Sequence, residues 1–197
     1  MRSAPRSSSA PETDGRRLRA EASRERIVRA LIALVQEGEL APSAEAVAER
    51  AGVGLRTVFR LFNDMETLHR EMQAVMIGRI APLFDQPLEG DWRERIDGLI
   101  ERRRRIFEEI LPLKSAGEAL RFRSAIIQAE HMRMTRMTRE MLLFLLPESV
   151  RADLPLVDAL DLALSFEGWR RLRQEQDLTP DQAEAVVRRL VSGLLDR

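Results

Sequence analysis

Residues 48–68 read AERAGVGLRTVFRLFNDMETL, and this stretch decides the fold. An alanine-rich segment runs into Gly52, and a second segment, which carries Arg56 and Arg60, begins at Leu55. Glycine readily adopts the left-handed backbone that ends a helix. The stretch therefore predicts two short helices, over 44–51 and 55–62, packed across a glycine turn. Three side chains of the second helix are expected to face inward: Val58, Phe59 and Phe62.

The residues beside this pair carry helix-capping signals. Ser43 is well placed to cap the first short helix, because a serine oxygen accepts a hydrogen bond from a free backbone N–H. Either Asn63 or Asp64 is expected to cap the following helix, and Asn63 with Glu66 has the spacing of a capping box. The pair of helices is thus predicted to have a defined beginning and end.

The rest of the chain shows apolar residues at helical spacing. Helices are predicted over about 16–38, 64–82, 92–112, 118–146, 156–176 and 180–195. No segment alternates apolar and polar residues for long enough to predict a strand, so the predicted fold class is all-α. Residues 1–15, which are rich in Ser, Pro and Ala, predict a disordered tail, followed by one domain over 16–66 and a larger one over 67–197.

Composition narrows the possible functions. The formal net charge is 0, but residues 1–60 hold 11 arginines against 8 acidic residues, a net +3, which hints at a polyanion-binding N-terminal segment. The chain has no cysteine, and its two histidines, His69 and His131, are too few for a histidine-based metal site. No apolar run approaches the roughly 20 residues that cross a bilayer. We therefore expect a cytoplasmic protein without a metal or other cofactor.

The spacing from Ser43 to Phe62 fits a helix-turn-helix, whose second helix presents its N-terminal residues to base edges in the major groove of double-stranded DNA. Arg56 is the expected base reader, because a guanidinium can donate two hydrogen bonds to guanine. Leu55 would touch a thymine methyl group, and Arg60 lies on the same helix. Phosphate contacts are expected from the side chains of Ser43 and Thr57 and from the backbone N–H groups at Ser43 and Gly54. The alternative is an ordinary helical hairpin with a solvated arginine face.

A basic arm at the start of the first helix could add phosphate contacts. Its members are Arg16, Arg17, Arg19, Arg24, Arg26 and Arg29. The alternative for each of these arginines is an ion pair with a neighbouring glutamate on the same helix. Both readings predict a solvent-exposed helix face.

Residues 24–68 resemble the N-terminal unit of the TetR/AcrR family of bacterial transcriptional regulators. The matching residues are Ala48, Ala51, Gly52, Val53, Thr57, Phe62 and Leu68. The departures are Gly54, Phe59, Leu61 and Met65, where the family usually has serine, tyrosine, a polar residue or histidine, and lysine. In the family the tyrosine and the lysine typically reach DNA phosphates, so Phe59 would keep the packing at a DNA-contacting position but lose the donor.

This resemblance implies that the larger domain binds a small-molecule effector and forms a homodimer through its last two helices. Residues 168–195 resemble the C-terminal stretch of many such regulators. The apolar residues available for the interface are Leu160, Leu164, Trp169, Leu172, Val186, Leu190 and Leu194. The alternative is that these side chains close the core of the monomer.

The candidate effector contacts are Glu130, His131 and Met134, in the predicted helix over 118–146, and Arg103. Methionine and phenylalanine stripes adapt to apolar ligands, yet at helical spacing they form core more often. Arg103 falls near an apolar stripe and would neutralise either an anionic ligand or a buried carboxylate. Its neighbours in ERRRRIFEE, residues 101–109, are expected to form a solvated face with i,i+4 ion pairs from Glu101 to Arg105 and from Arg104 to Glu108.

These features together predict a homodimeric, effector-responsive DNA-binding regulator, most simply a repressor. Two alternatives belong to other classes. The first is an enzyme, for which no nucleophile with a neighbouring base, phosphate loop or carboxylate pair stands out, so no catalytic residue is predicted. The second is a helical interaction protein that keeps the scaffold but has lost specific DNA binding, as Phe59, Leu61 and Met65 would permit.

Overall fold

The computed structural model describes residues 11–122 and 124–196. Among these residues the regular structure is helical and contains no strand, which confirms the all-α fold class. The chain divides into two compact units, 1–74 and 75–197. Their boundary falls inside α4 (Met65–Phe84), whereas the sequence placed it after residue 66. In the part of the chain that the structure describes, no helix is long and apolar enough to cross a membrane.

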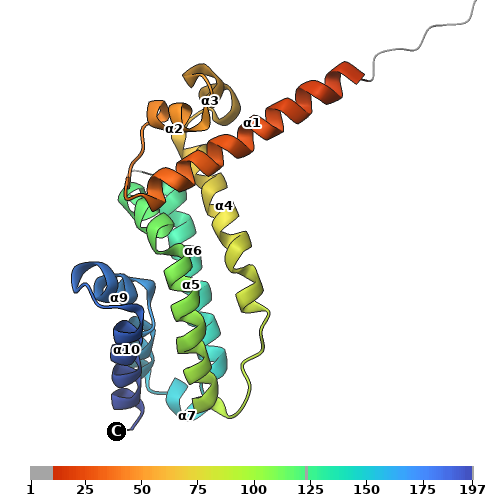
Figure 1. Cartoon of the computed structure of the whole chain (residues 1–197). Coiled ribbons are helices and arrows are strands. Elements are labelled where there is room, and N and C mark those ends of the chain that lie inside the picture. The colour runs from red at the N-terminus through yellow and green to blue at the C-terminus, as the bar shows by residue number, and fades with distance from the viewer. Residues whose placement is uncertain (1–10, 123, 197) are drawn as a thin grey trace, which may run out of the picture. The chain divides into compact units, whose positions relative to one another are not determined.

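The first unit is built on α1 (Pro11–Gln36), which packs against α2 (Ala44–Ala51) and α3 (Leu55–Phe62). The two short helices lie together beside α1 (Figure 1). Their shared core consists of fully buried side chains from α1, α2, α3 and the first turns of α4, namely Ile27, Leu31, Val35, Val47, Val58, Phe62, Leu68 and Met72. Each of the helices α2 and α3 is only eight residues long, and helices of this length are not stable by themselves in water. Both therefore depend on this core, which fixes them against α1.

Helix α1 begins earlier than expected. Residues 11–15, for which the sequence predicts a disordered tail, belong to α1, and residues 1–10 lie outside the described residues. Proline is well tolerated in the first turn of a helix, so Pro11 can start this one. An i,i+4 ion pair between Arg17 and Glu21, 3.2 Å long, supports the exposed N-terminal half of the helix.

The caps around the short helices are mostly as predicted. Ser43 Oγ accepts from the backbone N of Ala46 at 3.1 Å, and Gly52 has φ +63° in the left-handed region. The predicted capping box is wrong, because Asp64 Oδ1 accepts from the backbone N of Thr67 at 2.7 Å and caps α4. Asn63 instead takes a left-handed backbone with φ 57°, which makes the sharp exit from α3.

The glycine turn yields a prediction with a matched pair of variants. Gly52→Ala should lower the free energy of unfolding by about 1–2 kcal/mol, because alanine pays for a positive φ even though a Cβ would meet no atom within 4 Å. Gly54 has an extended backbone with φ −72° and no side-chain cap for α3. Gly54→Ser should therefore raise stability by a few tenths of a kcal/mol. Urea unfolding followed by far-UV circular dichroism measures the stability of both variants. Equal effects of the two variants would contradict the assignment of a left-handed backbone to Gly52 and an extended backbone to Gly54.

His69 in α4 makes the first unit sensitive to acid. The side chain is 2% exposed, its Nδ1 has no hydrogen-bond partner among the described residues, and burial lowers the pKa of its imidazole. The unfolded chain takes up a proton near pH 6.5, whereas the folded ring does so only at lower pH, so this contribution is complete above pH 6.5 and is lost as pH falls below it. The loss can reach at most about 1.4 kcal/mol per pH unit. His69→Leu should remove this dependence of the free energy of unfolding on pH in urea titrations between pH 7 and 5. An unchanged dependence would mean that carboxylates cause it.

The second unit packs α5 (Trp92–Arg121) against α6 (Ala125–Leu145) and α10 (Pro180–Leu195). The short α7 (Glu148–Arg151) leads into α8 (Leu154–Ala163), and α9 (Phe166–Arg170) continues into a π-helical turn, η1 (Arg171–Glu175). Figure 1 shows α5 and α6 side by side. The core of the unit includes Ile96, Leu99, Leu113, Leu142, Leu160, Leu164 and Trp169.

Three predicted helix boundaries in the second unit are wrong. Pro112 lies inside α5, which continues to Arg121, because buried side chains on both sides of the proline hold the helix together. The predicted helix over 118–146 is divided, and Ser124 Oγ caps α6 by accepting from the backbone N of Ile127. The predicted helix over 156–176 is also divided, since Ser165 starts α9 as its N-cap.

Candidate functional site

The α2–α3 pair is the strongest candidate for a functional surface. Helix α2 turns small side chains toward its neighbours, with Val47, Ala48 and Ala51 buried, so that another helix can approach closely. Val58 and Phe62 are each 1% exposed and anchor α3 in the core of the first unit. The remaining face of α3 is thereby turned outward.

Arg56 and Arg60 share that outward face. They are one helical turn apart, both are exposed, and neither has a hydrogen bond or an ion pair within the described residues. Leu55 and Thr57 flank Arg56 and are half-buried. Two guanidinium groups without carboxylate partners on one short helix form a surface suited to an anionic partner.

Phe59 does not face inward as predicted. Its side chain is 43% exposed, because position 59 lies on the flank of α3 between the buried pair Val58 and Phe62 and the arginine face. An exposed aromatic ring without a polar group thus lies beside Arg56 and Arg60. The ring can pack against a partner but can donate no hydrogen bond.

The N-termini of α2 and α3 present further polar groups. The Ser43 hydroxyl is exposed and caps α2 through its oxygen, which leaves its O–H able to donate. Gly54 is exposed and precedes α3 without a side-chain cap, so the first backbone N–H groups of α3 are not covered by a side chain. Helix N-termini with uncovered N–H groups favour anions such as phosphate.

The predicted basic arm separates into two groups. Arg16, Arg17 and Arg19 are exposed on the N-terminal part of α1, where Arg17 pairs with Glu21 and both partners are more than half exposed. Arg29 pairs with Glu25 at 3.1 Å in the same way. Arg24 is different, because it turns toward the core of the first unit and contacts Leu61 and Glu71.

The candidate effector contacts in the second unit are not brought together. Glu130 is exposed and pairs with Arg133 at 2.9 Å, and His131 lies 2.8 Å from Nη1 of Arg121. Met134 is half-buried. Arg103 meets α6 at Thr138, seven residues beyond His131, which is roughly 10 Å along the helix.

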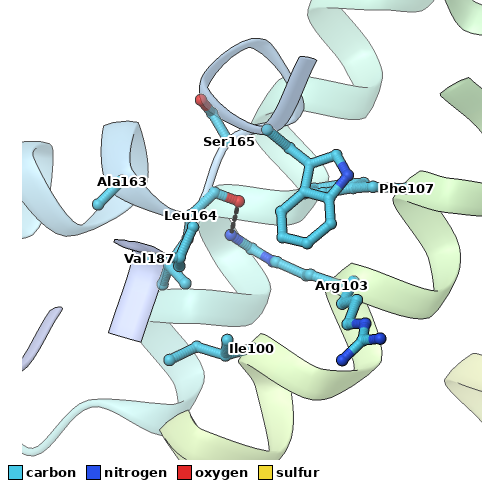
Figure 2. A pocket seen from close by; sticks show the side chains of 9 residues that line it. Ile100, Arg103, Phe107, Ala163, Leu164, Ser165 and Val187 are labelled. Carbon is cyan, nitrogen blue, oxygen red and sulfur yellow. Dashed lines mark hydrogen bonds between the residues drawn. The ribbon is translucent and has the colours of Figure 1, made fainter. Parts of the chain in front are cut away.

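Arg103 is a deeply buried charge of the second unit, with 7% exposure. Its Nη1 donates to the backbone oxygen of Leu164 at 2.6 Å (Figure 2). Its Nη2 donates to the backbone oxygen of Thr138 at 3.0 Å. Burial lowers the pKa of its guanidinium to about 10, with Asp161 acting in the opposite direction. Leu164 is the C-cap of α8, so Arg103 places a positive charge at the negative end of that helix.

A small cavity adjoins Arg103. It is lined largely by apolar side chains, including Ile100, Phe107, Leu164, Trp169 and Val187 (Figure 2). Its volume is about 10 Å³, which is room for about one water molecule. Two backbone oxygens accept hydrogen bonds from the Arg103 guanidinium, and among the described residues no carboxylate forms an ion pair with it.

The charged run 101–109 is not a self-paired face. Arg104 donates to Glu184 at 2.6 Å and to Asp181 at 2.5 Å, so it joins α5 to α10 instead of pairing with Glu108. Hydrogen bonding to Arg104 lowers the pKa of Glu184. Glu108 accepts from the Trp169 indole at 2.8 Å and from Arg173. These partners lie 61–80 residues apart in sequence, and no local spacing indicates them.

The apolar side chains expected at a dimer interface are mostly used within the unit. Leu160, Leu164, Trp169 and Leu172 are buried in one chain, which supports the alternative that they close the core. Val186 and Leu194 are half-buried. Leu190 on α10, which belongs to the expected set, is 49% exposed. Leu154 and Leu162 on α8, which do not belong to it, are 63% and 69% exposed.

Comparisons with known proteins place the fold. No protein-family model matches the chain, and no curated protein sequence matches it. A solved structure of a candidate transcriptional regulator from Streptomyces coelicolor A3(2) is similar, with a TM-score of 0.60 and 22% sequence identity over 86% of this chain and 98% of that one. The chain therefore shares the all-α fold of that regulator along nearly its whole length.

Proposed function

We propose that this protein is a DNA-binding transcriptional regulator of the TetR type that binds an inverted-repeat site in double-stranded DNA as a homodimer. The observation that carries the proposal is the outward face of α3, where Arg56 and Arg60 lie without ionic partners on a helix anchored by Val58 and Phe62. The glycine turn at Gly52 and the capped start of α2 give the geometry of a helix-turn-helix. The similar fold of a candidate regulator supports the same reading.

In this proposal α3 enters the major groove. Arg56, in the first turn of α3, reads a guanine, and Arg60 lies one turn further along. Ser43, Thr57 and the N–H groups that follow Gly54 contact phosphates, and Arg17 and Arg19 add charge from α1. Leu55 and Phe59 provide apolar contacts beside the arginines.

A homodimer accounts for the exposed leucines of the second unit. Leu162 on α8 and Leu190 on α10 belong to helices that pack against each other in one chain. Burial of both leucines against a second copy would remove their apolar surface from water and set the spacing of two α3 helices. The proposed regulator is a repressor that a small-molecule effector releases, and such an effector must bind the two dimer arrangements with different affinity.

Selection from a random DNA library, followed by titration at two salt concentrations with nonspecific competitor, tests this function. We expect an inverted repeat that is bound with a Kd in the range of about 10⁻⁸–10⁻¹¹ M. Sedimentation equilibrium of the same sample gives the number of chains per complex, and a monomer at these concentrations would overturn the homodimer.

A second candidate function follows from Phe59. At position 59 the TetR/AcrR family usually has a tyrosine, whereas this chain has an exposed phenylalanine ring that can donate no hydrogen bond. Leu61 and Met65 also depart from the pattern of that family. A helical scaffold that binds a protein partner through this apolar surface would show weak DNA binding that competitor abolishes. The same titration therefore distinguishes the two functions.

A further inference from the structure

A side chain of α1 holds the C-terminal end of α3. Nη1 of Arg24 donates to the backbone oxygen of Leu61 at 2.6 Å, and Nε donates to Oε2 of Glu71 in α4 at 2.8 Å. Nη2 also contacts the other carboxylate oxygen of Glu71. The guanidinium carbon lies 4.4 Å from the centre of the Phe62 ring. One arginine thus joins α1, α3 and α4.

These contacts lie where α3 lacks other support. The last carbonyl groups of a helix have no N–H partner within the helix, and Leu61 is the penultimate residue of α3. The helix has eight residues and no side-chain cap at Gly54, and so short a helix is not stable by itself in water. Asn63 follows with a positive φ of 57°, a conformation that costs energy for most residues other than glycine. A donor to the Leu61 oxygen therefore stabilises the end of α3.

We propose that Arg24 is a positioning residue, which fixes the direction of α3 and thereby of Arg56, and that Glu71 holds Arg24 in place. The effect on DNA rests on the function proposed above, whereas the effect on α3 does not. This role replaces the sequence-based hypothesis that Arg24 lies along DNA phosphates. Its nitrogens face Glu71 and Leu61 and one face of the guanidinium covers Phe62, so few of its donors remain for phosphate.

The variants Arg24→Gln and Glu71→Gln separate positioning from phosphate contact. If Arg24 positions α3, each variant lowers the affinity for the selected site about tenfold, and the double variant is no weaker than either single one. The slope of log affinity against log salt stays unchanged in both. If Arg24 contacts phosphate, Arg24→Gln lowers that slope by about one contact, and Glu71→Gln, which removes a negative charge, strengthens binding. The second pattern would overturn the proposal.

Arg17→Gln is the matched control for the loss of a phosphate-facing charge, because Arg17 is an exposed arginine of the same helix that pairs only with Glu21 among the described residues. It should lower the salt slope by about one contact and leave the exchange of the α3 amides unchanged. Arg24→Lys keeps the charge but not the planar fork, and should recover only part of the lost affinity.

Hydrogen exchange of the free protein supplies a readout that needs no DNA. The amides of residues 59–62 should exchange about ten times faster in Arg24→Gln and in Glu71→Gln than in the original chain, while those of α2 keep their rates. Unchanged exchange in α3 would overturn the positioning role. Faster exchange in a chain that binds no DNA would leave the positioning role standing and refute the proposed function.

Discussion

Replacing Arg56 by alanine is expected to lower the affinity for the selected DNA site by about 5- to 150-fold and to relax the preference at one base pair in each half-site. Arg56 is exposed in the first turn of α3, and no described carboxylate neutralises it. A guanidinium that donates twice to a guanine loses both bonds at once when truncated, which is the reason for the large and position-specific effect. The fold of the first unit should not change, because the Arg56 side chain is exposed.

Arg60→Ala is the control for this experiment. Arg60 shares the exposed face of α3 but lies one turn further from the N-terminal end of the helix. At this position we expect a contact to the DNA backbone and not to a base. Its loss should weaken binding to all sequences alike and lower the salt slope by about one unit. Selection experiments on both variants give the result. A uniform loss with Arg56→Ala and no change in base preference would make Arg56 a phosphate contact and leave the base reader unassigned.

Local signals in the sequence predicted the helix-turn-helix well. Gly52 was expected to end α2 with a left-handed backbone, and Ser43 was expected to cap it; the structure shows both. Proline at the start of α10 was equally informative, and Thr179 precedes it with a complete capping box. Each of these signals acts over three or four residues, which is the range that a single sequence reveals.

Long-range packing is what the sequence could not reveal. Pro112 was expected to end its helix, yet buried residues on either side carry α5 nine residues past it. Arg24 was grouped with its basic neighbours because its partner Glu71 lies 47 residues away. Phe59 was placed in the core because an aromatic residue beside Val58 fits an apolar stripe, and only the packing of α3 against α1 shows that the stripe ends at Val58 and Phe62.

Truncating Arg103 should have the largest effect on stability. Arg103→Ala is expected to lower the free energy of unfolding of the second unit by about 3 kcal/mol or more. The variant removes the donors to Leu164 and Thr138 and leaves a hole beside the existing cavity, which Phe107 and Trp169 also line. Both tryptophans of the chain, Trp92 and Trp169, belong to this unit, so urea unfolding followed by tryptophan fluorescence reports on it alone.

Arg103→Met decides whether volume or charge dominates. A guanidinium pKa lowered by burial to about 10 means that folding disfavours the buried cation by about 3 kcal/mol, which offsets much of what its hydrogen bonds contribute. Methionine keeps most of the volume and carries no charge, and Thr138 lies inside α6, where a helical N–H also serves its oxygen. Arg103→Met should therefore lie within about 1 kcal/mol of the original chain.

Arg133→Ala should be nearly silent, because its ion pair with Glu130 is exposed on both sides. If Arg103→Met lowered the free energy of unfolding as much as Arg103→Ala, the interaction of the guanidinium with the end of α8 would outweigh the cost of burying its charge. The junction between α8 and α9 would then depend on this one guanidinium.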